Sequence, residues 1–561
     1  MDRKPAKAEL PKPAKVELPK PALARRGLPR RLGASLILAT LTGLGALAAL
    51  FVAADALAQK RGGTFIVASE GEPGVLTAHL STDTSAVMIA SNLFNGLVGA
   101  DFKLQPIPEL AERWEVSPDE RTYTFFMNKS ARWHDGKPVT AHDAAFTLNE
   151  ITSKTHPRAG AWWPNVEFVR AVDDHTLVIQ LKAKYAPFLI LLANSLGMGT
   201  LIMPKHVYEG KDPKSNPANR NPVGSGPFKF SKWERGSHVE LVRNPVYFRA
   251  GKPYLDRVVF RFVPDAATRL IGIEKGELDF LHAYIVPYNE VDRLRKNPKV
   301  QVVNRGLERV ATNEFLFFNT RSGPLADVRV RQALAHAIDR NEIQKRALFG
   351  LGKVAHSALN SSLAWAYSDK FDVYKMRDPA RANALLDQAG FARKEGRRFA
   401  LRLTWDSGKE VEQRSAEIIR SNLRDVGIEV QMQTYDRATY IEKTYRQWDF
   451  DMAIQNSTTG PDPAVGVTRS YHTRQILKLP FVNAMAYSNP ELDRIFDTEY
   501  QQISVQKRAQ LWQRAQEILM RDLPGLPLFE FPVLNIASAG FNNVISGPMG
   551  YLESRENVSL K

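Results

Sequence analysis

Polar side chains gather in loops that follow predicted strands, and loops on a rigid scaffold often carry binding residues. One loop, Ser69 to Pro73, follows the short strand predicted within 61–68, and another, Asn456 to Pro463, follows the predicted strand 449–454. Their amide, hydroxyl and carboxylate groups can hydrogen-bond a small ligand. With the indole at the end of the predicted strand 399–404, the candidate ligand-binding residues are Glu70, Gly71, Trp405, Asn456, Ser457, Thr458 and Asp462.

Trp405 has two possible roles, because a Trp at a strand end either covers a ligand or packs in the core. The sequence leaves both open. Trp162 and Trp163 have the same ambiguity.

Signatures of catalysis are missing from the sequence. It contains no Gly-x-Ser-x-Gly, no His-Glu-x-x-His and no Walker loop, and no pair of acids is singled out by spacing. Gly224-Ser225-Gly226-Pro227 lacks the Lys-Ser/Thr of a phosphate loop, so we interpret it as a structural turn whose glycines permit positive φ. His336 stands alone on a predicted helix, which favours a packing or surface role. We therefore predict no enzyme activity and no catalytic residue.

Metal and cofactor sites are not predicted either. The eleven His residues are dispersed, and His134 with His142 lacks the i, i+4 spacing of a helical ligand pair. There is no Cys, which excludes disulfides, thiolate ligands and lipid attachment through an N-terminal Cys. A metal complex held by Arg and aromatic side chains remains an alternative.

Length and charge limit the class of protein. A chain of 561 residues with 44% hydrophobic content exceeds the size of a single core, so two or more lobes are expected. The net charge of +16 could suggest nucleic acid, but Lys and Arg are scattered among acids rather than clustered with aromatics. We expect no nucleic-acid partner.

The amino terminus predicts export. Residues 1–31 form a basic, Pro- and Lys-rich extension that should be disordered, and 32–58 combines an apolar run with the small-x-small pattern of Ala56-Leu57-Ala58. This is typical of a signal peptide cleaved after Ala58. An uncleaved membrane anchor is the alternative, and the choice between Sec and twin-arginine export stays open.

The segment Pro108 to Leu148 has the clearest local pattern. Tyr123, Phe125 and Met127 alternate as in a strand, and Asp135-Gly136 marks a tight turn. Thr140 is then expected to cap a helix, with Asp143 as the acidic half of a capping box. Further on, the apolar segments 399–404 and 428–434 flank a predicted helix over 412–426, and this β-α-β order predicts an α/β lobe with a partly parallel sheet.

The amino-acid sequences of several segments resemble those of a known family. Pro108 to Leu148, Leu241 to Asp256 and Asp327 to Arg340 occur in this order in the family 5 extracellular solute-binding proteins of bacterial ABC importers, the peptide- and nickel-type receptors. The resemblance implies a two-lobed periplasmic-binding-protein architecture, with an extra subdomain and a hinge between the lobes. It divides the chain into lobe I (59–97, 200–308 and 524–561), a lobe I subdomain (98–199) and lobe II (309–523).

The same resemblance implies a function. The protein would be a periplasmic, monomeric receptor that captures a peptide-like or related small solute between its lobes and delivers it to ABC permease subunits with a cytoplasmic ATPase. Closure then requires that the candidate loops of the two lobes face each other. A ligand-binding sensor or chaperone module, a nickel-complex receptor and a hydrolase are the alternatives.

The ligand class stays open at this point. Peptide-binding relatives generally carry an Asp early in the loop that corresponds to Asn456 to Pro463, where it pairs with the ligand's terminal ammonium. Here those positions hold Ser457, Thr458, Thr459 and Gly460. A peptide, an opine-like conjugate, a sugar or a metal complex would each fit.

Overall fold

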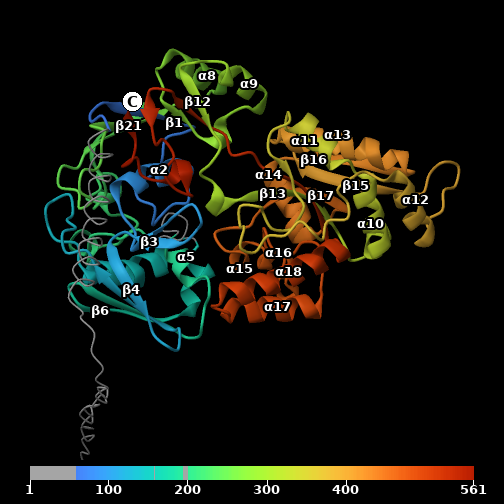
Figure 1. Cartoon of the computed structure of the whole chain (residues 1–561), viewed down its shortest axis with the longest axis horizontal. Coiled ribbons are helices and arrows are strands. Elements are labelled where there is room, and N and C mark those ends of the chain that lie inside the picture. The colour runs from blue at the N-terminus through green and yellow to red at the C-terminus, as the bar shows by residue number, and fades with distance from the viewer. Residues whose placement is uncertain (1–58, 157, 194–199) are drawn as a thin grey trace, which may run out of the picture. The chain divides into compact units, whose positions relative to one another are not determined.

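Three sheets of four or more strands organise the residues that the computed structural model describes, namely 59–156, 158–193 and 200–561 (Figure 1). The predicted extension 1–31 and the predicted signal segment 32–58, with its cleavage site, lie outside the described residues. Within those described ranges, no helix has both the length and the apolar character needed to cross a bilayer.

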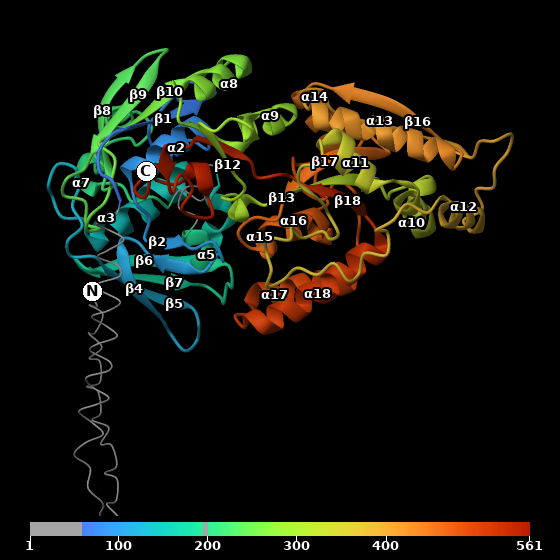
Figure 2. The ribbon, with the colours of Figure 1, turned by 45° about the horizontal axis from the view of Figure 1, so that its top comes forward.

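Lobe I is built on a seven-stranded sheet of order β12-β19-β11-β1-β10-β9-β8. Strand β1 runs parallel to β10 and β11, while the hairpin of β8 and β9 extends the sheet beyond β10 (Figure 2). The strands are β1 (Thr64–Ser69), β8 (Phe228–Glu234), β9 (His238–Arg243), β10 (Arg257–Phe262), β11 (Phe280–Leu281), β12 (Val300–Val303) and β19 (Asn535–Ser538). The helices of this part are α2 (Thr84–Leu93), α7 (Lys205–Tyr208), α8 (Ala266–Lys275) and α9 (Val291–Arg295).

The subdomain contains an antiparallel sheet of order β4-β5-β7-β6. Its strands are β4 (Ala111–Val116), β5 (Thr122–Met127), β6 (Val166–Asp173) and β7 (Thr176–Leu181), accompanied by the small pair β2 (Val98–Ala100) and β3 (Pro106–Pro108) and by α5 (Phe188–Leu192). Tyr123, Phe125 and Met127 are buried on one face of β5, which confirms the predicted alternation.

The predicted turn and helix cap are confirmed. Gly136 has φ 90°, and its amide donates to the carbonyl of Trp133 at 2.8 Å. Thr140 is the N-cap of α3 (Ala141–Phe146), and the Asp143 carboxylate accepts the Thr140 amide at 2.8 Å. The helix continues through the π-helical η1 (Thr147–Thr152) into α4 (Ser153–Thr155).

Gly224 and Gly226 form the expected structural turn, but for a different reason. Neither has positive φ; instead, a Cβ on Gly224 would lie 1.7 Å from the carbonyl oxygen of Leu93 at the end of α2. The His134 ring also holds this turn, accepting from the Gly224 amide at 3.1 Å through Nδ1. Burial lowers the pKa of His134 to about 4, so the ring is neutral near pH 7.

Lobe II is built on a six-stranded sheet of order β14-β18-β13-β17-β15-β16. Strands β15 and β16 are parallel and are joined by α13, which confirms the predicted β-α-β unit. The strands are β13 (Thr312–Phe318), β14 (Lys353–Val354), β15 (Phe399–Asp406), β16 (Ile428–Tyr435), β17 (Met452–Thr458) and β18 (Gly525–Glu530). The helices are α10 (Val328–Ala337), α11 (Arg340–Ala347), α12 (Pro379–Gln388), α13 (Glu410–Asp425), α14 (Arg437–Ile441), η9 (Glu442–Gln447), α15 (Pro463–Gly466), α16 (Thr468–Tyr471), α17 (Pro490–Gln501) and α18 (Val505–Asp522).

One predicted lobe boundary is wrong. Strand β18, expected in lobe I, pairs with β13 and β14 in the lobe II sheet. The chain therefore returns to lobe I after Glu530, not at residue 524. The other predicted domain limits stay a prediction.

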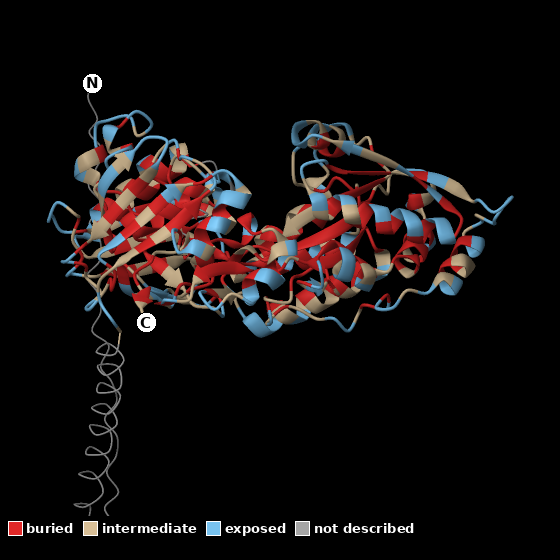
Figure 3. Ribbon diagram, turned by 90° about the horizontal axis from the view of Figure 1, so that it is seen from above, coloured by how far each residue is buried: buried red, intermediate tan, exposed pale blue. Residues whose placement is uncertain are grey.

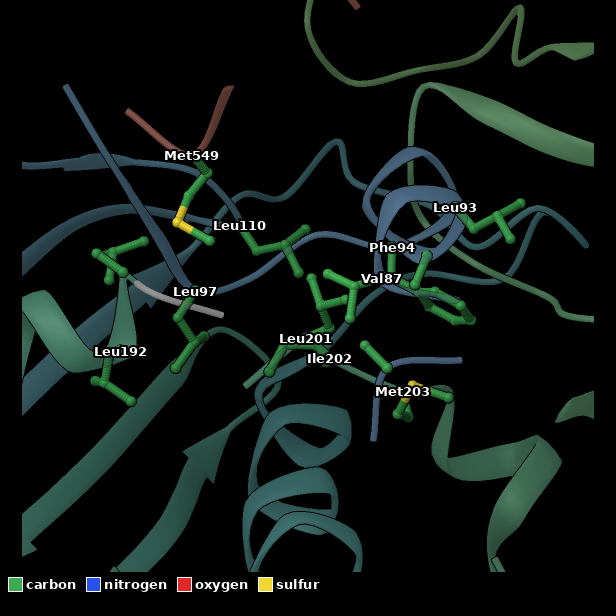
Figure 4. Packing of buried hydrophobic residues seen from close by; sticks show 14 of the residues in the cluster. Val87, Leu93, Phe94, Leu97, Leu110, Leu192, Leu201, Ile202, Met203 and Met549 are labelled. Atoms are coloured by element: carbon green, nitrogen blue, oxygen red, sulfur yellow. The ribbon is translucent and has the colours of Figure 1, made fainter. Parts of the chain in front are cut away.

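Buried residues concentrate on the strands of both large sheets (Figure 3). In the lobe I core, Leu93 and Phe94 lie with Leu201, Ile202 and Met549, which come from distant parts of the sequence (Figure 4). Lobe II has two packed faces, because successive residues of β13 point to opposite sides. Leu316 and Phe318 belong to one cluster, and Phe315 and Phe317 to the other.

Candidate functional site

Two connections join the lobes, and a pocket lies beside them. Residues 304–311 lead from β12 to β13, and residues 531–534 lead from β18 to β19. The pocket has a volume of about 490 Å³, within the range of small-molecule sites. Its lining includes Tyr284, Arg305, Thr312, Lys353, Ser361 and Glu530, and none of the predicted site residues.

On lobe I, the loop after β1 presents Glu70 and Gly71. The Ser69 hydroxyl donates to the Gly71 carbonyl at 2.9 Å and can accept from the Ser85 hydroxyl, whose oxygen lies 2.7 Å away, which shapes the turn. The neighbouring Glu72 accepts the Trp233 indole N–H at 2.9 Å and the Gly236 amide at 3.0 Å from the β8–β9 hairpin. The loop is thus tied down through Glu72, whereas Glu70 is exposed.

On lobe II, Asn456, Ser457 and Thr458 lie in strand β17 itself, not in the loop that follows it. The strand extends further than expected because it pairs along the whole of β13, with Asn456 opposite Glu314 and Thr458 opposite Thr312. All three candidates are half-buried. Arg469, from α16, donates to the Thr458 hydroxyl at 3.4 Å and adds a half-buried guanidinium.

Asp462 has a role in the fold. Its side chain is 3% exposed and caps α15 by accepting the Ala464 amide at 3.0 Å. Both carboxylate oxygens also accept from Arg508, at 2.7 and 2.8 Å, and Arg508 contacts Glu499 as well. In the described structure, this carboxylate is fully engaged within lobe II.

Trp405 packs in the core. It is the penultimate residue of β15, is 4% exposed and belongs to the cluster that contains Leu316 and Phe318. This burial favours a packing role for Trp405 over a role in covering a ligand. Whether any candidate residue contacts a ligand stays a prediction.

A group of charged residues at the end of β15 was missed from the sequence. Lys409 Nζ lies 2.6 Å from Glu412 Oε1, and Arg437 donates to Asp406 at 3.2 Å. Glu314 lies near them on β13 and is 0% exposed. The sequence did contain a signal for this group, because Glu314 stands two positions before Leu316 and so lies on the same inward face of a strand expected to be buried.

Two tyrosines of lobe I lie close to the start of the lobe II sheet. The Tyr551 ring packs edge-on against Tyr284 with 5.9 Å between the ring centroids. Tyr284 lines the 490 Å³ pocket together with Thr312, which is paired with Thr458 of β17. Burial, followed by Tyr284 and the Glu70 carboxylate, raises the pKa of Tyr551. Tyr284 thus lies between Tyr551 and the start of strand β13 in the lobe II sheet.

No set of three or more His, Asp or Glu side chains within residues 59–156, 158–193 and 200–561 is arranged to hold a metal ion.

Comparison with known proteins identifies the family. Residues 105–477 match the model of the bacterial extracellular solute-binding proteins, family 5 middle region. The oligopeptide-binding protein AppA of Bacillus subtilis is 30% identical over 453 residues, which cover 78% of this chain and 80% of that protein. The dipeptide-binding protein of Escherichia coli is 29% identical over 429 residues, covering 71% and 76% respectively.

A solved structure extends the match to the fold. The structure of B. subtilis AppA in complex with a nonapeptide superimposes with a TM-score of 0.70 at 27% identity, covering 90% of this chain and all of that one. Together with the two lobes and the ordered sequence motifs, these matches lead to one conclusion. The chain belongs to family 5 of the bacterial extracellular solute-binding proteins.

Proposed function

We propose that this protein captures a peptide-like solute between its two lobes and delivers it to the permease of an ABC importer, whose ATPase works in the cytoplasm. The observation that carries the proposal is the family match over residues 105–477. It is supported by the structural superposition, which includes the whole AppA chain. Two relatives named for binding oligopeptides and dipeptides support the peptide-like class.

The proposed site lies between the lobe I loop and the carboxyl end of strand β17 in the lobe II sheet. Glu70 and Gly71 would contribute from lobe I, and Asn456, Ser457 and Thr458 from β17. We assign Trp405 and Asp462 to the support of this surface, because the first packs in the core and the second is engaged by Arg508. Hydrogen bonding and hinge closure then account for binding without a catalytic group.

Delivery to a permease requires export. We propose that the chain is cleaved after Ala58 and works as a monomer in the periplasm. The support is the apolar run followed by Ala56-Leu57-Ala58, together with the extracellular character of the family.

Native mass spectrometry of protein purified from its host tests the proposal, because a closed receptor can retain its ligand. A bound peptide-like molecule, released when the protein is denatured, is the expected result. Recovery of a ligand-free protein that binds no member of a di- to nonapeptide library would contradict the peptide-like class.

A further inference from the structure

Glu314 is a fully buried acid on a strand whose neighbouring inward residues are apolar. It lies on β13, two positions before Leu316 and four before Phe318, both of which are fully buried. Its own side chain is 0% exposed. Burying a carboxyl group in such surroundings is unfavourable unless the group is paired.

The carboxyl group of Glu314 is unpaired. Neither oxygen has a hydrogen-bond partner in the part of the chain that the structure describes. The nearest cations are already engaged, because Lys409 contacts Glu412 at 2.6 Å and Arg437 contacts Asp406 at 3.2 Å. Burial is the main cause that raises the pKa of Glu314 well above its ordinary value; the charge of Glu412 adds to it, and the charges of Lys409 and Arg437 oppose it only in part.

The surroundings of Glu314 include lobe I. Tyr288, half-buried in η6 (Tyr288–Glu290), packs against both the lobe II cluster that contains Trp405 and the lobe I cluster that contains Ile285. Glu314 is close enough to Tyr288 to act on the tyrosine electrostatically. Part of the cover over this carboxyl group is therefore supplied by a residue of lobe I.

The cross-strand partner of Glu314 is Asn456, a residue of the proposed site. The remaining titratable groups that face Glu314 are Tyr440 and Tyr445, on α14 and η9. Neither supplies a cation. Beside the proposed site there is thus a desolvated acid without a hydrogen-bond partner in the described residues, and a donor that carries positive charge would pair with it best.

We propose that the Glu314 carboxylate anchors a cationic group of the solute, an ammonium or a guanidinium, on the lobe II side of the site. This assignment rests on the proposed function and specifies its ligand class. It also supplies the acid that the early positions of the Asn456 to Pro463 loop do not provide. Tyr288 is displaced or re-seated when the cation enters.

The test is a competition experiment on the purified protein with an equimolar library of tripeptides. Each peptide is offered with a free or an acetylated amino terminus and with Lys, Arg or Met in the centre, and capture is measured by native mass spectrometry. Wild type should prefer peptides with a cationic group over acetylated Met peptides. Glu314→Gln keeps the shape of a protonated Glu, so it should lose about tenfold or more of this preference while still folding.

Two variants serve as controls. Glu314→Asp retains the charge and should retain a cation preference. Glu553→Gln alters a half-buried glutamate in the C-terminal segment, whose carboxylate accepts the Met549 amide at 2.9 Å, and should bind like wild type. Circular dichroism and melting curves establish that each variant is folded.

A second measurement needs no variant. Calorimetric titration of wild type with the preferred cationic tripeptide at pH 6, in two buffers of different ionisation enthalpy, should show proton release as Glu314 ionises on binding. Absence of proton release, or an unchanged preference in Glu314→Gln, would overturn the assignment.

If acetylated Met peptides are captured as well as peptides that carry a cationic group, the assignment is overturned and the proposed function still stands. Capture of no peptide at all would count against both.

Discussion

Asp462→Asn separates folding from ligand binding at the loop that the sequence marks as a binding site. Asn retains the size of the side chain and an oxygen for the cap of α15, but it removes the charge that faces Arg508 at 2.7 and 2.8 Å. Breaking a buried ion pair costs about 3–5 kcal/mol, and a hydrogen bond to a charged group contributes about 1.5–3 kcal/mol. Because Glu499 still contacts Arg508, we expect the lower range, about 1.5–3 kcal/mol.

The change should also act through Glu499. Burial, followed by the charge of Asp462, raises the pKa of Glu499 to about 7. A carboxyl group whose pKa is higher in the folded state stabilises the protein at low pH, and this stabilisation is lost as the pH rises through about 7. Asp462→Asn removes one cause of the raised pKa, so the free energy of unfolding should vary less between pH 5.5 and 8 than in wild type.

Urea unfolding at both pH values measures these effects, and titration of the folded variant with the captured solute measures its affinity. The control is Asp369→Asn, which breaks a surface pair with Lys375 at 3.2 Å and should cost at most about 1 kcal/mol. An unchanged urea midpoint together with a tenfold or larger loss of affinity would refute the structural role and restore Asp462 as a ligand contact.

Three further predictions follow from packing and charge. Trp405→Ala should lower the free energy of unfolding by about 3–5 kcal/mol, measured by urea denaturation, because it leaves a cavity beside Leu316; a folded, equally stable variant with weak binding would favour the ligand-covering role. Gly224→Ala should destabilise the protein by about 1–3 kcal/mol or more, seen as a lower melting temperature, because its Cβ would meet the Leu93 carbonyl at 1.7 Å; an unchanged melting temperature would contradict this contact. Thr458→Ala should weaken solute binding several-fold in calorimetry without changing the melting temperature, whereas Thr498→Ala, on exposed α17 surface, should change neither; equal affinities in all three proteins would remove Thr458 from the site.

Local patterns predicted the elements that depend on near neighbours. The alternation in β5, the turn at Gly136 and the cap at Thr140 each involve residues within a few positions, so propensity and spacing were sufficient. The β-α-β unit of β15, α13 and β16 was predicted for the same reason.

Features set by distant partners could not be predicted. Arg508, which engages Asp462, lies 46 positions away, and the need for glycine at 224 arises from a helix end in another part of lobe I. Strand β18 was missed because Pro524 and Pro527 are typical of a break; the sheet accepts Pro527 opposite Phe315, where the register with β13 shifts. The extra length of β17 likewise comes from its pairing with β13.

The central claim is that a solute is enclosed between two lobes that close on it. Small-angle X-ray scattering tests this most directly, on mature protein purified from its host, first freed of ligand and then saturated with the solute that native mass spectrometry identifies. Closure predicts a smaller radius of gyration in the saturated protein, reversed when the solute is removed. The same radius in both states, at a solute concentration where calorimetry shows full occupancy, would contradict the claim.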